Sequence, residues 1–133
     1  MLRGSVFLIV LCVGGGFACG ATLVRNGAAE AVIVTASSPT PAARLAALEL
    51  RFHIEKITGL RLPQVTAGSN FPARIRILVG DNSETRRLGL RPCDFAPQEY
   101  LIRITDEHIV LFGRDWEGTE AERKETGCDT HLR

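Results

Sequence analysis

Apolar and polar positions follow two different periods along the chain, and each period predicts a different element. Between Thr40 and Gly59 apolar residues recur every three to four positions, the period of an amphipathic α-helix. Thr40 can cap the first turn, and Pro41 suits the first helical position because its missing N–H would have no partner there. Gly59 can adopt the left-handed conformation that ends a helix. The pattern therefore predicts one long helix with both ends marked.

This predicted helix carries apolar residues on two faces. The face expected to lie on a sheet comprises Ala43, Ala46, Ala47, Leu50, Ile54 and Ile57. Leu45, Leu48 and Phe52 fall on the opposite face, which is usually polar when a helix covers the sheet of an isolated domain. We therefore interpret Leu45, Leu48 and Phe52 as a candidate interface.

Strand patterns lie on both sides of the helix. Residues 22–25 and 31–35 flank the turn pair Asn26-Gly27 and predict a hairpin, and the unbroken apolar run of 31–35 predicts a place inside a sheet. Residues 60–66 can form at most an edge strand, because Pro63 lacks a backbone donor. Three further elements are expected later in the chain: a strand at 74–79, a short helical turn ending near 88, and a hairpin of 99–105 with 108–112.

Together these elements predict an α+β fold. We expect a mixed β-sheet of about five or more strands, with the long helix packed on one face as a crossover between the first hairpin and the strand at 74–79. The chain after Gly113 is charged and small, so it offers little to cover the other face. With 133 residues the chain is long enough for one small domain.

The two ends of the chain have a different character from its middle. Residues 1–21 combine Arg3, a short apolar run and small residues, and this pattern predicts a signal peptide and a secreted or periplasmic location. The apolar run is less than half of the roughly 20 residues that cross a bilayer, so no stable membrane span is expected. Cys19 leaves a lipoprotein as the lesser alternative. Residues 22–115 form the expected domain, and residues 116–133 a polar tail that is either disordered or the start of an interrupted continuation.

Composition and motifs exclude several classes of function. The chain has 16 basic and 15 acidic residues, a balance that does not favour nucleic acid as a partner. No spacing of ligands suggests a metal, no glycine pattern suggests a cofactor, and no catalytic constellation can be identified. His53 follows Glu49 by one helical turn and is interpreted as a local pair.

Two weaker signals remain in the sequence. Cys93 and Cys128 can form a disulfide in an exported chain, and the favoured interpretation is two unrelated thiols. Trp116 is a candidate for stacking on a sugar ring, with Phe95 as a second aromatic on a loop.

The order of these motifs resembles a known domain family. The segments LVRNG, AVIVTASSPTPAARLAALELRFHIEKITGLRLPQV, RIRILVGDN and EYLIRITDEHIVLFGRD are similar to the non-catalytic N-terminal domain that precedes the barrel of α-glucuronidases and bacterial β-N-acetylhexosaminidases. The matching positions are Thr58 with Gly59, Leu62, Pro63, Val65, Gly80 with Asp81, Tyr100, and Gly113 to Asp115. The resemblance implies a zincin-like arrangement without zinc ligands and without catalytic residues. The chain departs from the family after Thr119, where the family continues with an apolar helix that leads into the barrel.

The function that the resemblance implies is an accessory one. We expect a non-catalytic domain of a secreted carbohydrate-active protein of the glycoside hydrolase type, bracing a catalytic barrel that this chain does not contain. The expected partner is that barrel or another chain, packed on the outer face of the helix, with carbohydrate as a further candidate ligand. The alternative is a free-standing carbohydrate-binding or protein-interaction module.

Overall fold

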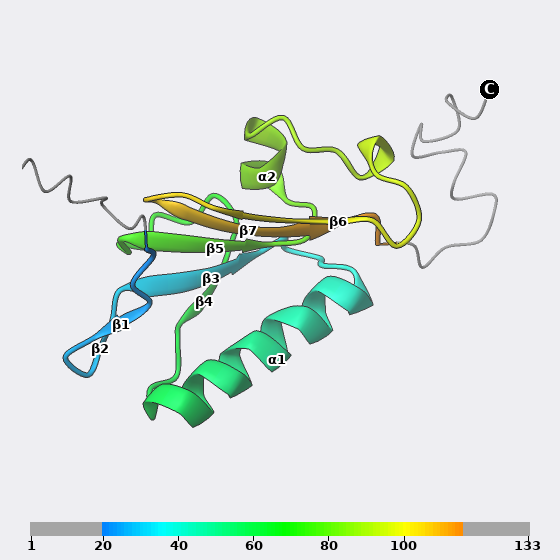
Figure 1. The fold of residues 1–133 in the computed structure, drawn as a ribbon. Coiled ribbons are helices and arrows are strands. Elements are labelled where there is room, and N and C mark those ends of the chain that lie inside the picture. Colours follow the sequence, from blue (N-terminus) through cyan, green and yellow to red (C-terminus); the bar gives the residue numbers. More distant parts are fainter. Residues whose placement is uncertain (1–19, 116–133) are drawn as a thin grey trace, which may run out of the picture.

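A computed structural model describes residues 20–115, which fold around one mixed sheet (Figure 1). Its strands are β3 (Ala31–Thr35), β4 (Gln64–Thr66), β5 (Ile75–Val79), β6 (Tyr100–Ile104) and β7 (His108–Gly113). They lie in the order β4-β3-β5-β7-β6. Neighbouring strands are parallel from β4 to β7, and β6 pairs antiparallel with β7. The predicted α+β class, a mixed sheet with one long helix, is confirmed.

The first predicted hairpin is wrong in one of its strands. β1 (Val24–Arg25) pairs with β2 (Ala28–Ala29), not with the strand at 31–35. Asn26 and Gly27 both have positive φ, of 50° and 73°, so the turn is tight and the returning strand starts at once. β3 is thereby left to pair in parallel with β4 on one side and β5 on the other. All five of its residues are buried, as its unbroken apolar run predicts.

The long helix α1 (Pro41–Thr58) begins and ends where its capping residues predict. Thr40 Oγ1 accepts a hydrogen bond from the Ala43 N–H at 3.1 Å, and Gly59 has a φ of 72°. The helix joins β3 to β4, which lies at the edge of the sheet as Pro63 requires.

The buried face of α1 is narrower than the apolar pattern predicts. Ala43, Ala47 and Ile54 are buried, and Leu50 packs half-buried beside them. The prediction is wrong for Ala46, which is exposed, and for Ile57, whose exposed fraction is 83%. The physical reason is that α1 packs on β3 and β5. Only residues directed at those two strands are therefore covered.

The opposite face of the sheet is covered, contrary to expectation. The chain between β5 and β6 forms α2 (Ser83–Arg87) and a short 3₁₀ turn, η1 (Pro92–Asp94), and Figure 1 shows α2 on the side of the sheet away from α1. The apolar residues packed there are Val32, Val34, Leu78, Leu90, Val110 and Phe112. The sheet therefore has a hydrophobic core on each face, and the cover of the second comes from a connection inside the domain, not from the tail.

Candidate functional site

The ion pairs of the described residues are mostly local, with Glu30 as an exception that lies 3.0 Å from Arg25 and 3.7 Å from Arg74. His53 Nε2 lies 3.4 Å from Glu49 Oε2 on the exposed side of α1, in agreement with the local pair expected from the sequence. Asp81 accepts two hydrogen bonds from Arg86, at 2.9 and 2.6 Å. Arg91 bonds Asp94 in the same bidentate way. Pairs of this kind hold neighbouring segments together, and none of these three faces a second acid or base.

The most enclosed ion pair has a structural role. Arg76 on β5 donates to both carboxylate oxygens of Glu84 on α2 at 2.8 Å, and the Gly68 N–H donates to the same carboxylate at 3.0 Å. The hydrogen bond from Arg76 lowers the pKa of Glu84 below its ordinary value of 4.5, against an opposing effect of burial. The same bond raises the pKa of Arg76. A carboxylate locked between an arginine and a backbone amide ties α2 to the sheet and is not available as a proton donor.

Some of the remaining candidate residues predicted from the sequence lie among the described residues, and the others lie at the two ends of the chain. Cys93 lies in η1, whereas Cys128, Trp116 and Cys19 lie outside the described residues, as do residues 1–19 of the predicted signal peptide. Phe95 is half-buried with its ring 5.3 Å from that of Phe112, so it serves the core and not a sugar platform. Within residues 20–115 no three His, Cys, Asp or Glu side chains are placed to share a metal ion. No helix in the same range has the length and apolarity to cross a membrane.

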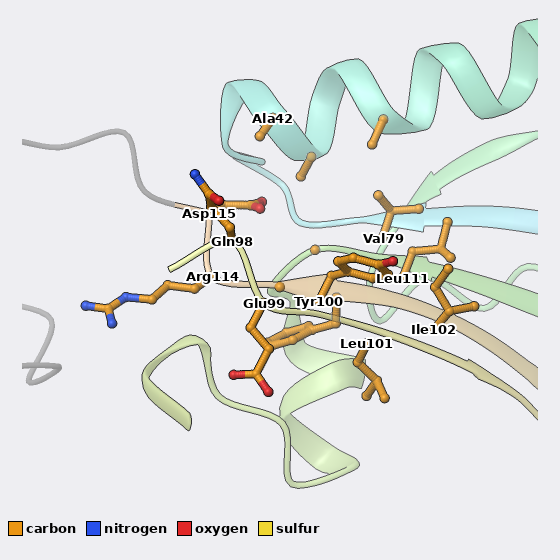
Figure 2. A pocket seen from close by; sticks show the side chains of 15 residues that line it. Ala42, Val79, Gln98, Glu99, Tyr100, Leu101, Ile102, Leu111, Arg114 and Asp115 are labelled. Carbon is orange, nitrogen blue, oxygen red and sulfur yellow. The ribbon is translucent and has the colours of Figure 1, made fainter. Parts of the chain in front are cut away.

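A groove of about 410 Å³ runs between the N-terminal half of α1 and strands β6 and β7. Ala42, Ala43 and Ala46 form its helical wall. Its floor comes from the sheet, and Figure 2 shows Val79, Ile102 and Leu111 projecting from the strands toward the helix. The groove is therefore apolar on two sides.

Three of the polar residues at the mouth of the groove, Glu99, Arg114 and Asp115, are directed elsewhere or already bonded. Glu99 and Arg114 point away from α1 in Figure 2, and Glu99 accepts from the Ala96 N–H at 2.7 Å. Asp115 lies beside the start of α1 and accepts a hydrogen bond from Thr40 Oγ1 at 2.8 Å. These bonds close one end of the groove and hold the end of β7 against the helix. The other polar groups of the lining are the Gln98 amide and the Tyr100 hydroxyl.

Beside the groove the sheet is open to solvent. Tyr100, Ile102 and Ile104 alternate along β6 and so share one face, and their exposed fractions are 74%, 59% and 55%. This face is the one on which α1 lies, since Tyr100 and Ile102 line the groove together with the alanines of the helix. We call Tyr100, Ile102 and Ile104, with Leu111 of β7, the open sheet face.

The candidate interface residues of α1 also lie in solvent. Leu45, Leu48 and Phe52 have exposed fractions of 60%, 45% and 51%. Phe52 has the ammonium of Lys56 over its ring at 5.3 Å. We call Leu45, Leu48 and Phe52 the outer stripe. Together with the open sheet face it makes two apolar surfaces on one side of the molecule.

Comparisons with family models, curated proteins and solved structures gave no match. The two apolar surfaces are therefore the features of the described residues that indicate a role. Sequence reasoning identified the outer stripe but missed the open sheet face. The signal for it was the alternate spacing of Tyr100, Ile102 and Ile104 in the strand predicted at 99–105, which places all three on one face. What the pattern could not show is that α1 stops short of β6.

Proposed function

We propose that residues 22–115 are a non-catalytic accessory domain of a secreted carbohydrate-active protein, with a role in packing against another protein unit. One observation carries the packing role: large apolar side chains are exposed on two surfaces of the same side of the fold, while Asp81, Glu99 and Asp115 are already bonded within the domain. Exposed apolar area of this size is typical of surfaces that bind protein. The carbohydrate context rests on the sequence resemblance alone.

The partner implied by the resemblance is a catalytic barrel that packs on the outer stripe. The free-standing carbohydrate-binding module remains the alternative through Trp116. The groove gives that alternative little support, because sugar sites need polar groups that converge on the ring hydroxyls, and Asp115 and Glu99 are already bonded within the domain.

The test uses the purified chain in two assays. It is incubated with chromogenic glycosides that include a glucuronide and an N-acetylglucosaminide, and it is applied to a glycan array. The proposal expects no hydrolysis above buffer and no retention on any glycan. Hydrolysis that copurifies with the chain, or glycan binding that is lost in Trp116→Ala, would replace the accessory role with that of an enzyme or a binding module.

A further inference from the structure

The two apolar surfaces have shapes that complement each other. The outer stripe is a helix surface in which residues 45, 48 and 52 follow one another at helical spacing. The open sheet face is a strand surface directly beside α1. A helix on a sheet is the standard way in which two such surfaces are buried. One molecule cannot join them, because its own outer stripe points away from its own sheet.

The space beside α1 matches the width of one further helix. α1 contacts β3 and β5, β7 carries the half-buried residues Ile109 and Leu111 on the same face, and β6 beyond it is exposed. Adjacent strands are about 4.8 Å apart, so the centre of the pair β7 and β6 lies about 9 to 10 Å from the centre of the pair β3 and β5. This is the usual distance between the axes of two packed helices. Ala42 and Ala46 form the wall on that side at the N-terminal half of α1, where small side chains let a second helix approach closely. The pair Glu49 and His53 continues the same flank by helical spacing.

We propose that this second helix is α1 of a second copy of the chain. A twofold axis parallel to the strands, between the two helices, places each α1 over β6 and β7 of the other molecule. The two helices then lie side by side in a middle layer, with one sheet on either side, and their axes cross because α1 is inclined to β5, β6 and β7 (Figure 1). Each outer stripe contacts the open sheet face of the partner, so a single symmetric contact covers all of these residues in both molecules.

The symmetry also determines which residues meet. Rotation about an axis parallel to the strands keeps every residue at its own level along the strands. Ala46 and Ile102 line the same groove, so Leu45 and Leu48 of one copy come to lie over Tyr100 and Ile102 of the other. Phe52 lies one helical turn further along and meets Ile104, two residues further along β6.

The buried area favours a second copy as the occupant. A fully exposed side chain of this size presents roughly 200 Å², so the six exposed residues of the outer stripe and of β6 present on the order of 700 Å² per molecule. A twofold interface would then bury on the order of 1,400 Å², within the range of specific protein interfaces. A single added helix from another protein would cover the open sheet face but leave the outer stripe in water. A second copy covers both surfaces with the same two surfaces of its own.

This inference rests on the part of the proposed function that assigns these surfaces to protein packing. It does not use the resemblance to carbohydrate-active proteins, and it places a second copy on the outer stripe where the resemblance would place a barrel. The first experiment is sedimentation velocity of the purified chain at about 5 to 100 µM, which spans the affinities of typical specific dimers. We expect a dimer that dissociates toward the low end of the range. Leu48→Lys and Ile102→Lys should each give a monomer over the same range, because either lysine would be buried without a partner.

The matched control is Leu88→Lys. Leu88 is an apolar residue with an exposed fraction of 41%, and it follows α2 on the other side of the sheet. This variant should sediment as the wild type does. Far-UV circular dichroism of each variant establishes that it is folded. A wild-type chain that stays monomeric at 100 µM would overturn the inference, and so would a dimer that Leu48→Lys leaves intact.

A mixing experiment tests the reciprocal contact itself. Leu48→Lys and Ile102→Glu should each be monomeric alone. When the two variants are mixed, they should form a heterodimer in which the introduced lysine meets the introduced glutamate at one contact and the native Leu48 and Ile102 meet at the other. Failure of the mixture to associate would exclude this pairing.

A cross-linking control separates this dimer from simple pairing of the free β6 edges. Edge pairing would bring Ile102 next to its own symmetry mate, whereas the proposed dimer brings it next to Leu48. The double variant Leu48→Cys with Ile102→Cys should therefore cross-link between molecules more efficiently than Ile102→Cys alone. Equal cross-linking of the two variants would overturn the proposed arrangement. A monomeric result leaves the glycosidase and glycan assays to decide the accessory role, so the two proposals fail separately.

Discussion

Gly80 lies directly beside Ala43 of α1, and its replacement by alanine has a calculable effect. The residue follows β5 with a φ of 68°, a conformation that costs a residue with a Cβ about 1 kcal/mol. A Cβ at this position would also lie 2.7 Å from the Cβ of Ala43. Because the obstacle is a helix side chain without rotamers, the backbone must move, and overpacking of this kind costs about 1 to 3 kcal/mol. We therefore expect Gly80→Ala to lose about 3 kcal/mol of the free energy of unfolding.

The assay is urea denaturation followed by far-UV circular dichroism. With an m-value of about 1.5 kcal/mol/M, a loss of about 3 kcal/mol lowers the midpoint by about 2 M. Gly89→Ala is the matched control, since Gly89 has a φ of 79° and its added Cβ would meet nothing within 4 Å. Gly89→Ala should lose only the cost of the positive φ, about 1 kcal/mol of the free energy of unfolding.

A double variant checks the cause. Ala43→Gly removes the obstructing methyl group, so Gly80→Ala should be less destabilising in the Ala43→Gly background than in the wild type. Equal losses for Gly80→Ala and Gly89→Ala would refute the reasoning, because they would mean that α1 does not press on the end of β5. So would additive effects in the double variant.

Two further predictions concern the hydrogen bonds that hold α1 and α2. Thr40→Ala removes both the cap of α1 and the bond to Asp115, so it should lose about 1 to 2 kcal/mol in the same urea assay. Thr40→Ser keeps the hydroxyl and should retain most of that stability; a serine variant as weak as the alanine one would contradict this. The fold lowers the pKa of Glu84. The ion pair of Glu84 with Arg76 therefore stabilises the folded chain fully above about pH 4.5, and this stabilisation is lost as the pH falls through the pKa of Glu84 in the folded chain. The difference in unfolding free energy between wild type and Glu84→Gln should therefore shrink below about pH 4.5, and a constant difference down to about pH 3 would be inconsistent with the ion pair.

The elements that sequence reasoning predicts well are those specified by neighbouring residues. The ends of α1 follow from Thr40, Pro41 and Gly59, because capping is a contact between residues a few positions apart. The hairpin of β6 and β7 follows from two apolar runs joined by a short polar turn. The edge position of β4 follows from the missing donor of Pro63.

The errors lie where pairing joins residues far apart. The sequence pattern predicts the turn at Asn26 and Gly27 correctly but places the returning strand one element too late, since both 28–29 and 31–35 suit a strand. The connection between the helical turn and β6 received no predicted element, and its apolar residues received no place in a core. Leu90 and Phe95 in fact close the second core, and no local period marks them because the segment is neither regular helix nor strand.

By itself the sequence determined the fold class, the limits of the long helix and the presence of a second apolar stripe on it, because each depends on local periodicity and capping. Tertiary structure decided the strand order, the cover of the second face and the reach of α1 across the sheet. That reach is set by which strands the helix packs on, and packing depends on the relative placement of segments that share no local pattern. The open sheet face of β6 and β7, and with it the proposed dimer, follows from the fact that α1 lies on β3 and β5 and stops there.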